Sequence, residues 1–313
     1  MAVFAVTGVA GFIGSNIVRG LVEDGHEVRV VDDLATGHKE NLADLTDIVE
    51  IHEGTILDAA LLGEAFADVD YVLHQAALAS VPRSVKDPVA SNAANVDGTL
   101  NVLVAARDAG VKRVVYASSS SVYGDTPVLP KHEDMIPTPQ SPYAVSKLAG
   151  EYYCRAFTRV YDLETVSLRY FNVYGPRQDP QSQYAAVIPI FIRRMMAGEP
   201  VIVFGDGEQS RDFTYVDDVV TANIQAAQAP GAAGAVVNLG CGERHTLNRL
   251  IALLQELTGC DTPPKYAAPR PGDVKHSQAD ITRAREVIGY DPQVSFLDGV
   301  RRTFEWYRRQ ESG

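Results

Sequence analysis

The sequence predicts a doubly wound α/β fold, in which helices cover both faces of a parallel sheet and a smaller C-terminal α/β lobe follows. Two observations lead to this prediction. Short β-branched runs alternate with helix-like stretches through the first half of the chain. A glycine-rich turn also separates the first strand from the first helix, where such folds bind phosphates. We expect strands at 3–6, 27–31, 71–74, 113–116 and 165–168, and helices at 12–24 and 91–109.

The pattern changes near residue 178. Short apolar runs at 201–204 and 236–239 are mixed there with loops rich in proline and glycine and with a helix at 246–257. We therefore expect two units, residues 1–177 and 178–313, and we expect the chain of the second to cross back to the main sheet.

The composition narrows the classes of function. Of the 313 residues 46% are hydrophobic, enough for a sizeable core, and no apolar run is long enough to span a membrane. The formal charge of -12 disfavours a nucleic-acid partner, because an acidic surface repels the phosphate backbone. The three cysteines and seven histidines lack ligand spacing, so we expect no disulfide framework, no metal site and a cytoplasmic location.

A dinucleotide site is expected at residues 7–14, between the first strand and the first helix. Gly8 permits the tight turn, Gly11 lets a pyrophosphate approach the backbone, and Gly14 allows close packing of helix on strand. Asp32 ends the second strand, where a carboxylate hydrogen-bonds an adenosine ribose and favours NAD over its 2′-phosphorylated form. A glycine turn that only packs the helix is the alternative.

A tyrosine and a lysine four residues apart are the candidate catalytic pair. Tyr143 and Lys147 share one face of the expected helix, so the ammonium is expected to lower the pKa of the phenol toward that of a general base. Ser119, at the end of a strand, is placed to hydrogen-bond the same substrate oxygen. The alternative is a core tyrosine, a solvated lysine and a polar serine loop.

These residues resemble the short-chain dehydrogenase/reductase superfamily, through the GxxGxxG spacing and the YxxxK pair. Nearly the whole chain is similar to the extended branch, and within it to nucleotide-sugar 4-epimerases, through residues 74–77, 168–175, 205–213 and 270–273. The resemblance implies a Rossmann-like domain with the catalytic pair over 1–177, and mainly a nucleotide-sugar lobe over 178–313.

The resemblance also implies NAD as the cofactor and a set of residues that bind it. These are Gly8, Gly11, Phe12, Ile13, Asp32, Asp33, Leu34, Thr36, Gly37, Thr55, Ile56, Gln75, Ala76, Ala77, Ala79, Asn95, Ala117, Ser118, Tyr143, Lys147, Tyr170 and Val173. Thr55 departs from the family, in which an aspartate usually binds the adenine amino group, so the adenine contact is expected to be weaker.

A UDP-sugar is the substrate that the resemblance implies. Its expected ligands are Ser80, Ser119, Ser120, Ser121, Tyr143, Asn172, Ala186, Val187, Val203, Phe204, Arg211, Arg270, Asp273 and Ser277. Arg211 and Arg270 would bind the pyrophosphate, since guanidinium forks suit phosphate oxygens, and Asp273 would bind the uridine ribose.

The serine run distinguishes between reactions. Sugar-nucleotide 4,6-dehydratases carry an Asp-Glu pair where this chain has Ser120 and Ser121, which cannot act as acid and base near neutral pH. The resemblance then implies 4-epimerisation: Tyr143 takes the proton of the 4-hydroxyl, NAD takes the hydride, and the 4-keto sugar receives both back on the other face. Another nucleotide-sugar oxidoreductase, a dehydratase-like enzyme and a non-enzymatic NAD-binding regulator stay open as alternatives.

Two positions bear on the sugar. Ser277 replaces a tyrosine that is frequent in glucose-type epimerases and leaves room for an N-acetyl group, and Ala79 stands where those enzymes carry a lysine. We expect UDP-GlcNAc and UDP-GalNAc, with UDP-glucose and UDP-galactose as a second pair. Relatives pair through four-helix bundles, so we also expect a homodimer built from the helices at 91–109 and 143–159.

Overall fold

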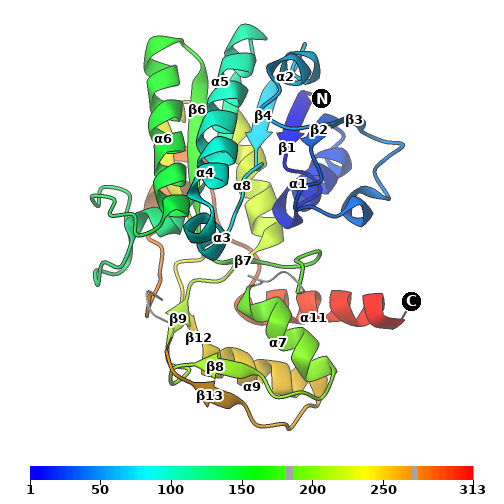
Figure 1. The fold of residues 1–313 in the computed structure, drawn as a ribbon, viewed down its shortest axis with the longest axis vertical. Helices are drawn as coiled ribbons and strands as arrows, with labels where there is room; N and C mark the ends of the chain where they lie inside the picture. Colours follow the sequence, from blue (N-terminus) through cyan, green and yellow to red (C-terminus); the bar gives the residue numbers. More distant parts are fainter. Residues whose placement is uncertain (181–185, 270–273, 313) are drawn as a thin grey trace.

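A seven-stranded parallel sheet forms the centre of the molecule in the computed structural model, which describes residues 1–180, 186–269 and 274–312 (Figure 1). The strand order β11-β6-β5-β4-β1-β2-β3 reverses its direction of winding between β1 and β4. The strands are β1 (Val3–Thr7), β2 (Glu27–Asp32), β3 (Glu50–Glu53), β4 (Tyr71–His74), β5 (Arg113–Ser119), β6 (Glu164–Tyr170) and β11 (Ala235–Leu239). Ligands of such sheets bind at this reversal, beyond the carboxyl ends of the strands.

Helices cover both faces of the sheet and confirm the predicted doubly wound class. One apolar cluster packs β-strands against α1 (Phe12–Glu23), α8 (Val216–Gln228) and α10 (Thr282–Ile288). A second packs the other face against α2 (Ala59–Ala65), α5 (Gly98–Asp108) and α6 (Pro142–Val160). Leu21 and Val219 are fully buried on the first face, as are Val102 and Leu103 on the second. Removal of these apolar side chains from water stabilises the layers.

The helix expected at 91–109 is present and runs without a break over 88–108, but it contains a π-helical turn. It follows α3 (Val81–Lys86) and consists of α4 (Pro88–Asn92), a π-helical turn η2 (Ala93–Asp97) and α5. Proline at the first position and a cap from Asp87 to the Ala90 N–H (3.0 Å) start α4. The π turn shifts the register of the side chains, and such turns often mark functional sites.

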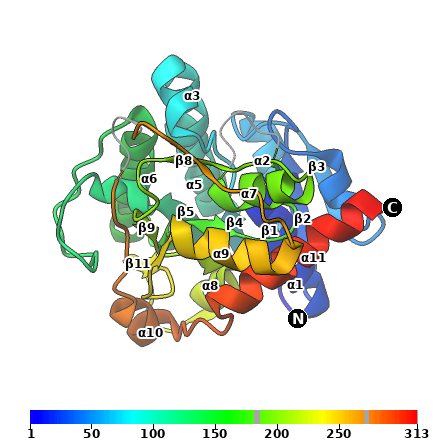
Figure 2. The ribbon, with the colours of Figure 1, turned by 90° about the horizontal axis from the view of Figure 1, so that it is seen from below.

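The smaller lobe lies below the carboxyl ends of the large sheet in Figure 1, and Figure 2 looks onto it from beneath. Its own apolar core joins α7 (Val187–Met196), α9 (Leu247–Thr258) and α11 (Phe296–Ser312). Short strand pairs complete it: β8 (Ile202–Phe204) with β13 (Lys265–Ala267), β9 (Ser210–Arg211) with β12 (His245–Thr246), and β7 (Val173–Tyr174) with β10 (Thr214–Tyr215).

The chain passes between the two parts several times. After β10 it returns to the large sheet as α8 and β11, leaves for α9, and returns again as α10. β11 pairs in parallel with β6, which keeps its carboxyl end on the side of the lobe. In the part of the chain that the structure describes, no helix is long and apolar enough to cross a membrane.

Candidate active site

The glycine turn begins where β1 ends. Gly8 has a φ of +75°, and a Cβ built on it would lie 2.5 Å from the Ala76 backbone nitrogen, so only glycine lets β1 and the chain after β4 approach this closely. Gly11 is the N-cap of α1 and offers no side-chain cap. The first N–H groups of α1 are therefore left for a ligand, and the helix dipole makes that ligand an anion.

Asp32 clamps this turn from the end of β2. Its carboxylate accepts the Ala10 N–H (2.9 Å) and the Leu34 N–H (2.8 Å), and Leu34 takes a positive φ of 57°. Burial raises the pKa of Asp32, although the backbone donors oppose this rise. The carboxylate thus has a structural role besides the expected ribose contact.

A cavity of about 660 Å³ opens beside the turn at the reversal point of the sheet. Most of the expected NAD residues line it: Gly8, Gly11, Phe12, Ile13, Asp32, Asp33, Thr36, Thr55, Ile56, Gln75, Ala76, Ala77, Ala79, Ala117, Ser118, Tyr143, Lys147 and Tyr170. The expected substrate residues Ser80 and Ala186 also line this cavity. Leu34, Gly37, Asn95 and Val173 are not among its lining residues, and a Cβ on Gly37 would overlap Ala10.

The N-terminus of α6 places the catalytic pair. The Ser141 hydroxyl accepts the Ala144 N–H (3.2 Å) and Pro142 opens the helix, so Tyr143 lies in its first turn and Lys147 one turn later. Lys147 Nζ donates to the Ala117 carbonyl at 2.8 Å and lies 6.0 Å from the Tyr143 ring centroid. The pair therefore shares one face of α6, as the spacing predicts, and Lys147 contacts β5 near its end.

The electrostatics differ from expectation. Burial raises the pKa of the Tyr143 phenol above its ordinary value, and the hydrogen bond with Ser119 only partly offsets this effect. Burial also lowers the pKa of Lys147 to about 8. The expected lowering of the phenol pKa by Lys147 is absent, because the ammonium is directed at the Ala117 carbonyl and loss of water outweighs its field.

A buried polar chain joins the glycine turn to α6. His74 contacts Thr7 Oγ1 through Nδ1 (2.7 Å) and Thr99 Oγ1 through Nε2 (3.0 Å). Thr99 donates its hydroxyl proton to the Asn95 carbonyl (2.7 Å), so we assign the imidazole proton to Nε2. The Asn95 side chain then donates to Ser146 Oγ (3.0 Å). Burial holds the pKa of His74 near 3, which keeps the ring neutral.

Ser118 belongs to a second buried network. Its hydroxyl donates to Glu151 Oε1 (2.5 Å), and Arg169 binds the same carboxylate through Nε (2.8 Å) and Nη2 (2.7 Å). Both charged side chains are at most 5% exposed. Among the described residues Arg169 Nη1 has no hydrogen-bond partner. The pair ties β5, β6 and α6 together behind the catalytic residues.

A second cavity of about 430 Å³ lies in the smaller lobe and shares Ala186 with the first. Its walls include the expected substrate residues Asn172, Val187, Phe204 and Arg211, together with Val173. Val203 is fully buried in the lobe core, so its side chain packs rather than lining the cavity. Arg270 and Asp273 lie outside the described residues.

The remaining expected substrate residues lie close to these walls. Ser277 Oγ accepts from Asn172 Nδ2 at 3.4 Å. Ser119 Oγ accepts the Ser121 N–H (3.2 Å) and caps the 3₁₀ turn η3 (Ser120–Tyr123). Ser121 Oγ is buried, and no partner for it is present among the described residues. Ser119, Ser120 and Ser121 do not line either cavity.

Several residues that line the first cavity were missed by sequence reasoning. They include His38 after β2, Arg83 on α3, and the run Arg177, Gln178 and Asp179 after β7. A signal existed for the run, because Gly175 and Pro176 mark a turn directly after the 168–175 stretch. Nothing local in the sequence indicates that this turn folds over the glycine loop.

The described residues fit an NAD molecule. An uncapped helix N-terminus faces a large cavity, a carboxylate lies at the end of β2, and small residues after β4 and near the end of β5 also line the cavity. The N-terminus would hold the diphosphate and Asp32 the adenosine ribose. This fold and site define an NAD-binding enzyme of the extended short-chain dehydrogenase/reductase class.

Comparison with known proteins gives the family. The model of the NAD dependent epimerase/dehydratase family matches residues 4–240, and the chain belongs to this family. The UDP-glucose 4-epimerase of Mycolicibacterium smegmatis is 43% identical over 309 residues, which cover 97% of this chain and 98% of the relative. The family confirms NAD as the cofactor, and such relatives confirm the expected class of enzyme, an isomerase.

Two solved structures resemble the fold over 99% of both chains. The UDP-glucose 4-epimerase of Thermotoga maritima, solved with UDP-glucose, has a TM-score of 0.94 and 42% identity. The UDP-N-acetylglucosamine 4-epimerase of Methanobrevibacter ruminantium, solved with UDP-N-acetylmuramic acid, has a TM-score of 0.95 and 42% identity. Equal identity to the two leaves the choice of sugar to the geometry of the site.

Proposed function

We propose that this protein is an NAD-dependent UDP-sugar 4-epimerase that inverts the C4 hydroxyl of a hexose through a 4-keto intermediate. The observation that carries the proposal is the junction of the two cavities. Tyr143 and Lys147 line the first, Arg211 lines the second, and Ala186 lines both. A nucleotide sugar whose diphosphate binds at Arg211 would bring its hexose toward Tyr143.

The side chains divide the chemistry between them. Tyr143 Oη accepts the proton of the 4-hydroxyl and later returns it, while Ser119 hydrogen-bonds the same oxygen. When bound, NAD⁺ supplies the hydride acceptor and a positive ring that favours the phenolate. The neutral His74 and the carbonyl-anchored Lys147 hold the glycine turn and α6 in place through the first proton transfer and the second.

The residues after Ser119 favour epimerisation over dehydration. Ser120 and Ser121 form the turn η3, and a hydroxyl there cannot exchange protons near neutral pH as a carboxyl pair does. Loss of water from the sugar needs such an acid and base. Oxidation at C4 followed by return of the hydride remains the reaction that these side chains support.

We propose UDP-GlcNAc and UDP-GalNAc as the preferred substrates, with the unsubstituted hexoses as a second pair. Ser277 lies beside Asn172, a residue of the second cavity, and its small side chain leaves the hexose region open for an acetyl group. Ala79, on the wall of the first cavity, adds no bulk either.

The test compares two substrates on matched variants. With NAD supplied, the wild-type protein should interconvert UDP-GlcNAc and UDP-GalNAc, as read by NMR. Ser277→Tyr should lower kcat/KM for UDP-GlcNAc at least about tenfold more than for UDP-glucose, because a filled pocket rejects the larger sugar. Ser277→Ala, which keeps the space, should leave the ratio nearly unchanged. An equal effect of both variants on the two sugars would contradict the preference.

We further propose a homodimer that pairs through α6 and the helices beside it. The outward face of α6 carries apolar side chains with little cover: Val145 is 53%, Tyr152 55% and Val160 67% exposed. Contiguous apolar surface of this kind marks interfaces between proteins. A second copy of the same face is the partner expected under two-fold symmetry.

We propose the cytoplasm as the compartment in which the enzyme works. Cys154, Cys241 and Cys260 are all free thiols in the structure. A reducing environment preserves such thiols.

A further inference from the structure

The segment after β7 folds over the first turn of α1. Asn16 Nδ2 donates to the Phe12 carbonyl (2.8 Å) and to the Pro176 carbonyl (3.1 Å), and so fastens this segment to the helix N-terminus. Asp179 and His38 both line the cavity and contact each other, with Asp179 Oδ2 3.4 Å from His38 Nε2. The Tyr307 hydroxyl of α11 donates to the Gln178 carbonyl. The segment 176–179 is thus held from three sides.

Arg177 has an uncommon backbone within this segment. Its φ of +69° lies in the left-handed region, which costs a residue with a Cβ on the order of 1 kcal/mol or more. Such conformations persist where the surroundings hold them, and they concentrate at ligand sites. This strained residue also lines the 660 Å³ cavity, as Gly11 and Phe12 do.

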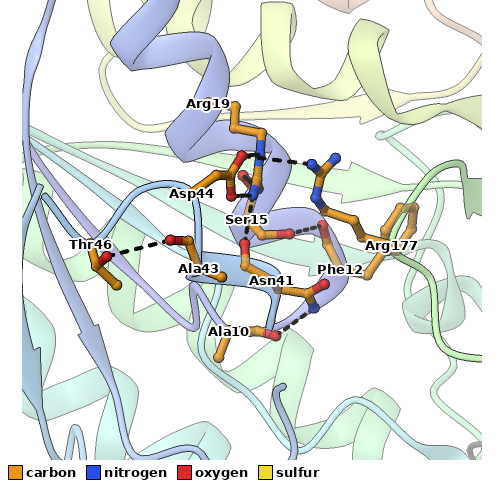
Figure 3. A network of polar contacts seen from close by, with 9 residues as sticks. All are labelled: Ala10, Phe12, Ser15, Arg19, Asn41, Ala43, Asp44, Thr46 and Arg177. Carbon is orange, nitrogen blue, oxygen red and sulfur yellow. Dashed lines mark hydrogen bonds and ion pairs between the residues drawn. The ribbon is translucent and has the colours of Figure 1, made fainter. Parts of the chain in front are cut away.

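The charge of Arg177 is not balanced by its described neighbours. Asp44 is engaged by Arg19, which binds it through Nε (3.1 Å) and through Nη2 (Figure 3). Arg177 Nη2 approaches the same carboxylate only to 4.0 Å. Two guanidinium groups therefore share one carboxylate, which leaves a net positive charge beside the first two turns of α1. Burial and the field of Arg19 lower the pKa of Arg177, although a guanidinium stays protonated.

The acids that line the same cavity have other donors. Asp32 accepts two backbone N–H groups, Asp33 accepts the Ala35 N–H (3.0 Å), and Asp179 faces His38. The Arg177 side chain is only 23% exposed, so water screens its charge weakly. An anion that bridges the helix N-terminus and Arg177 would satisfy both.

We propose that Arg177 is a ligand of the NAD diphosphate, and this inference rests on the proposed function only in taking NAD as the bound molecule. The diphosphate carries two negative charges, which match the open N–H groups of α1 on one side and a guanidinium fork on the other. Arg177 lines the first cavity and is not among the lining residues of the second, which separates its role from that of Arg211.

The experiment measures binding to the full-length protein after bound nucleotide has been removed. ADP-ribose contains the diphosphate and adenosine does not. Adenosine binding is measured by competition. Arg177→Gln should weaken ADP-ribose about ten- to a hundredfold, as expected for a lost charge-assisted pair, and leave adenosine within about threefold. Arg177→Lys keeps the charge without the fork and should fall between wild type and Arg177→Gln.

Lys39→Gln is the matched control. Lys39 is 70% exposed, pairs with Glu53, and carries the same charge near the cavity without lining it. It should change both dissociation constants by less than about threefold, because solvent screens it. Thermal unfolding of each nucleotide-free variant checks that the fold is kept.

Two results would overturn the inference. Unchanged ADP-ribose binding by Arg177→Gln would remove the contact. An equal loss for adenosine and ADP-ribose would mean that Arg177 only shapes the segment 176–179. A wild-type protein that binds neither NAD nor ADP-ribose would instead refute the cofactor on which the proposed function depends, and this inference would fail with it.

Discussion

Lys147 has the least ordinary surroundings of the proposed catalytic residues. It is 4% exposed, its ammonium donates to the Ala117 carbonyl, and burial lowers its pKa to about 8. Burying this charge lowers the free energy of unfolding of the protonated protein by about 1.4 kcal/mol for each unit by which the pKa is lowered. We interpret it as stability given up for a cation close to the reacting oxygen.

This cost predicts how stability changes with pH. Between about pH 8 and the pKa near 10.4 of an unfolded lysine, the unfolded chain binds a proton at Lys147 that the folded chain does not, so rising pH favours folding. The stability of wild type relative to Lys147→Met should rise across this window by about 2–3 kcal/mol. Urea unfolding of both proteins at pH 7.5 to 10 measures it. A constant difference would show that Lys147 titrates normally in the folded protein.

For individual residues, local spacing in the sequence predicts only part of the site. Tyr143 and Lys147 follow from an i, i+4 pattern on one helix, and Gly8 and Gly11 follow from a turn within a few residues. Arg177 was missed because its surroundings come from α1 and from the segment after β2, far away in the sequence. The predicted lowering of the Tyr143 pKa was wrong because burial, which outweighs the neighbouring cation, cannot be read from spacing.

At the scale of elements, α6 does more than carry the catalytic pair. Glu151, one turn after Lys147, joins it to β5 through Ser118 and to β6 through Arg169. The sequence offers no signal for this ion pair, because a charged residue on a helix is usually solvated. The π turn η2 was missed for a similar reason: it lies inside an apolar pattern that predicts one α-helix, and the buried contact of Asn95 with Ser146 cannot be read from that pattern.

The buried pair predicts an unequal effect of single and double substitutions. Glu151→Leu leaves the Arg169 charge buried without its partner and should lower the free energy of unfolding by about 3–5 kcal/mol. The double variant Glu151→Leu/Arg169→Met removes both charges and should recover much of that loss. Urea denaturation of wild type, both single variants and the double variant completes the cycle. Additive losses would argue against coupling between the two side chains.

At the scale of the whole molecule, the alternation of strands and helices predicts the sheet, because parallel strands need long crossovers. The structure differs from the expectation in the parts where the chain moves between the large sheet and the smaller lobe. Val203 packs in the core of the smaller lobe, although the resemblance implied a ligand contact. Residues 245–246 pair with β9 by long-range contacts that no local pattern indicates.

The exposed apolar face of α6 predicts that the protein forms a homodimer. Light scattering coupled to size exclusion should give twice the chain mass for wild type, and Tyr152→Asp should shift the protein toward monomer, because a carboxylate would be buried against its own copy. Lys39→Asp makes a comparable acidic change at an exposed position outside these helices, in the segment after β2. This variant should change the measured mass less than Tyr152→Asp does. A wild-type monomer at all concentrations would refute the proposed dimer.

In the proposed reaction C4 is oxidised and reduced within one active site. UDP-GlcNAc deuterated at C4, incubated in ordinary water with the protein and NAD, tests this. We expect that UDP-GalNAc forms and that both epimers keep the deuterium at C4, because the hydride leaves and returns without meeting solvent. Tyr143→Phe should slow this reaction about a hundredfold or more. Epimer formed with loss of the deuterium to water would refute hydride transfer within the active site.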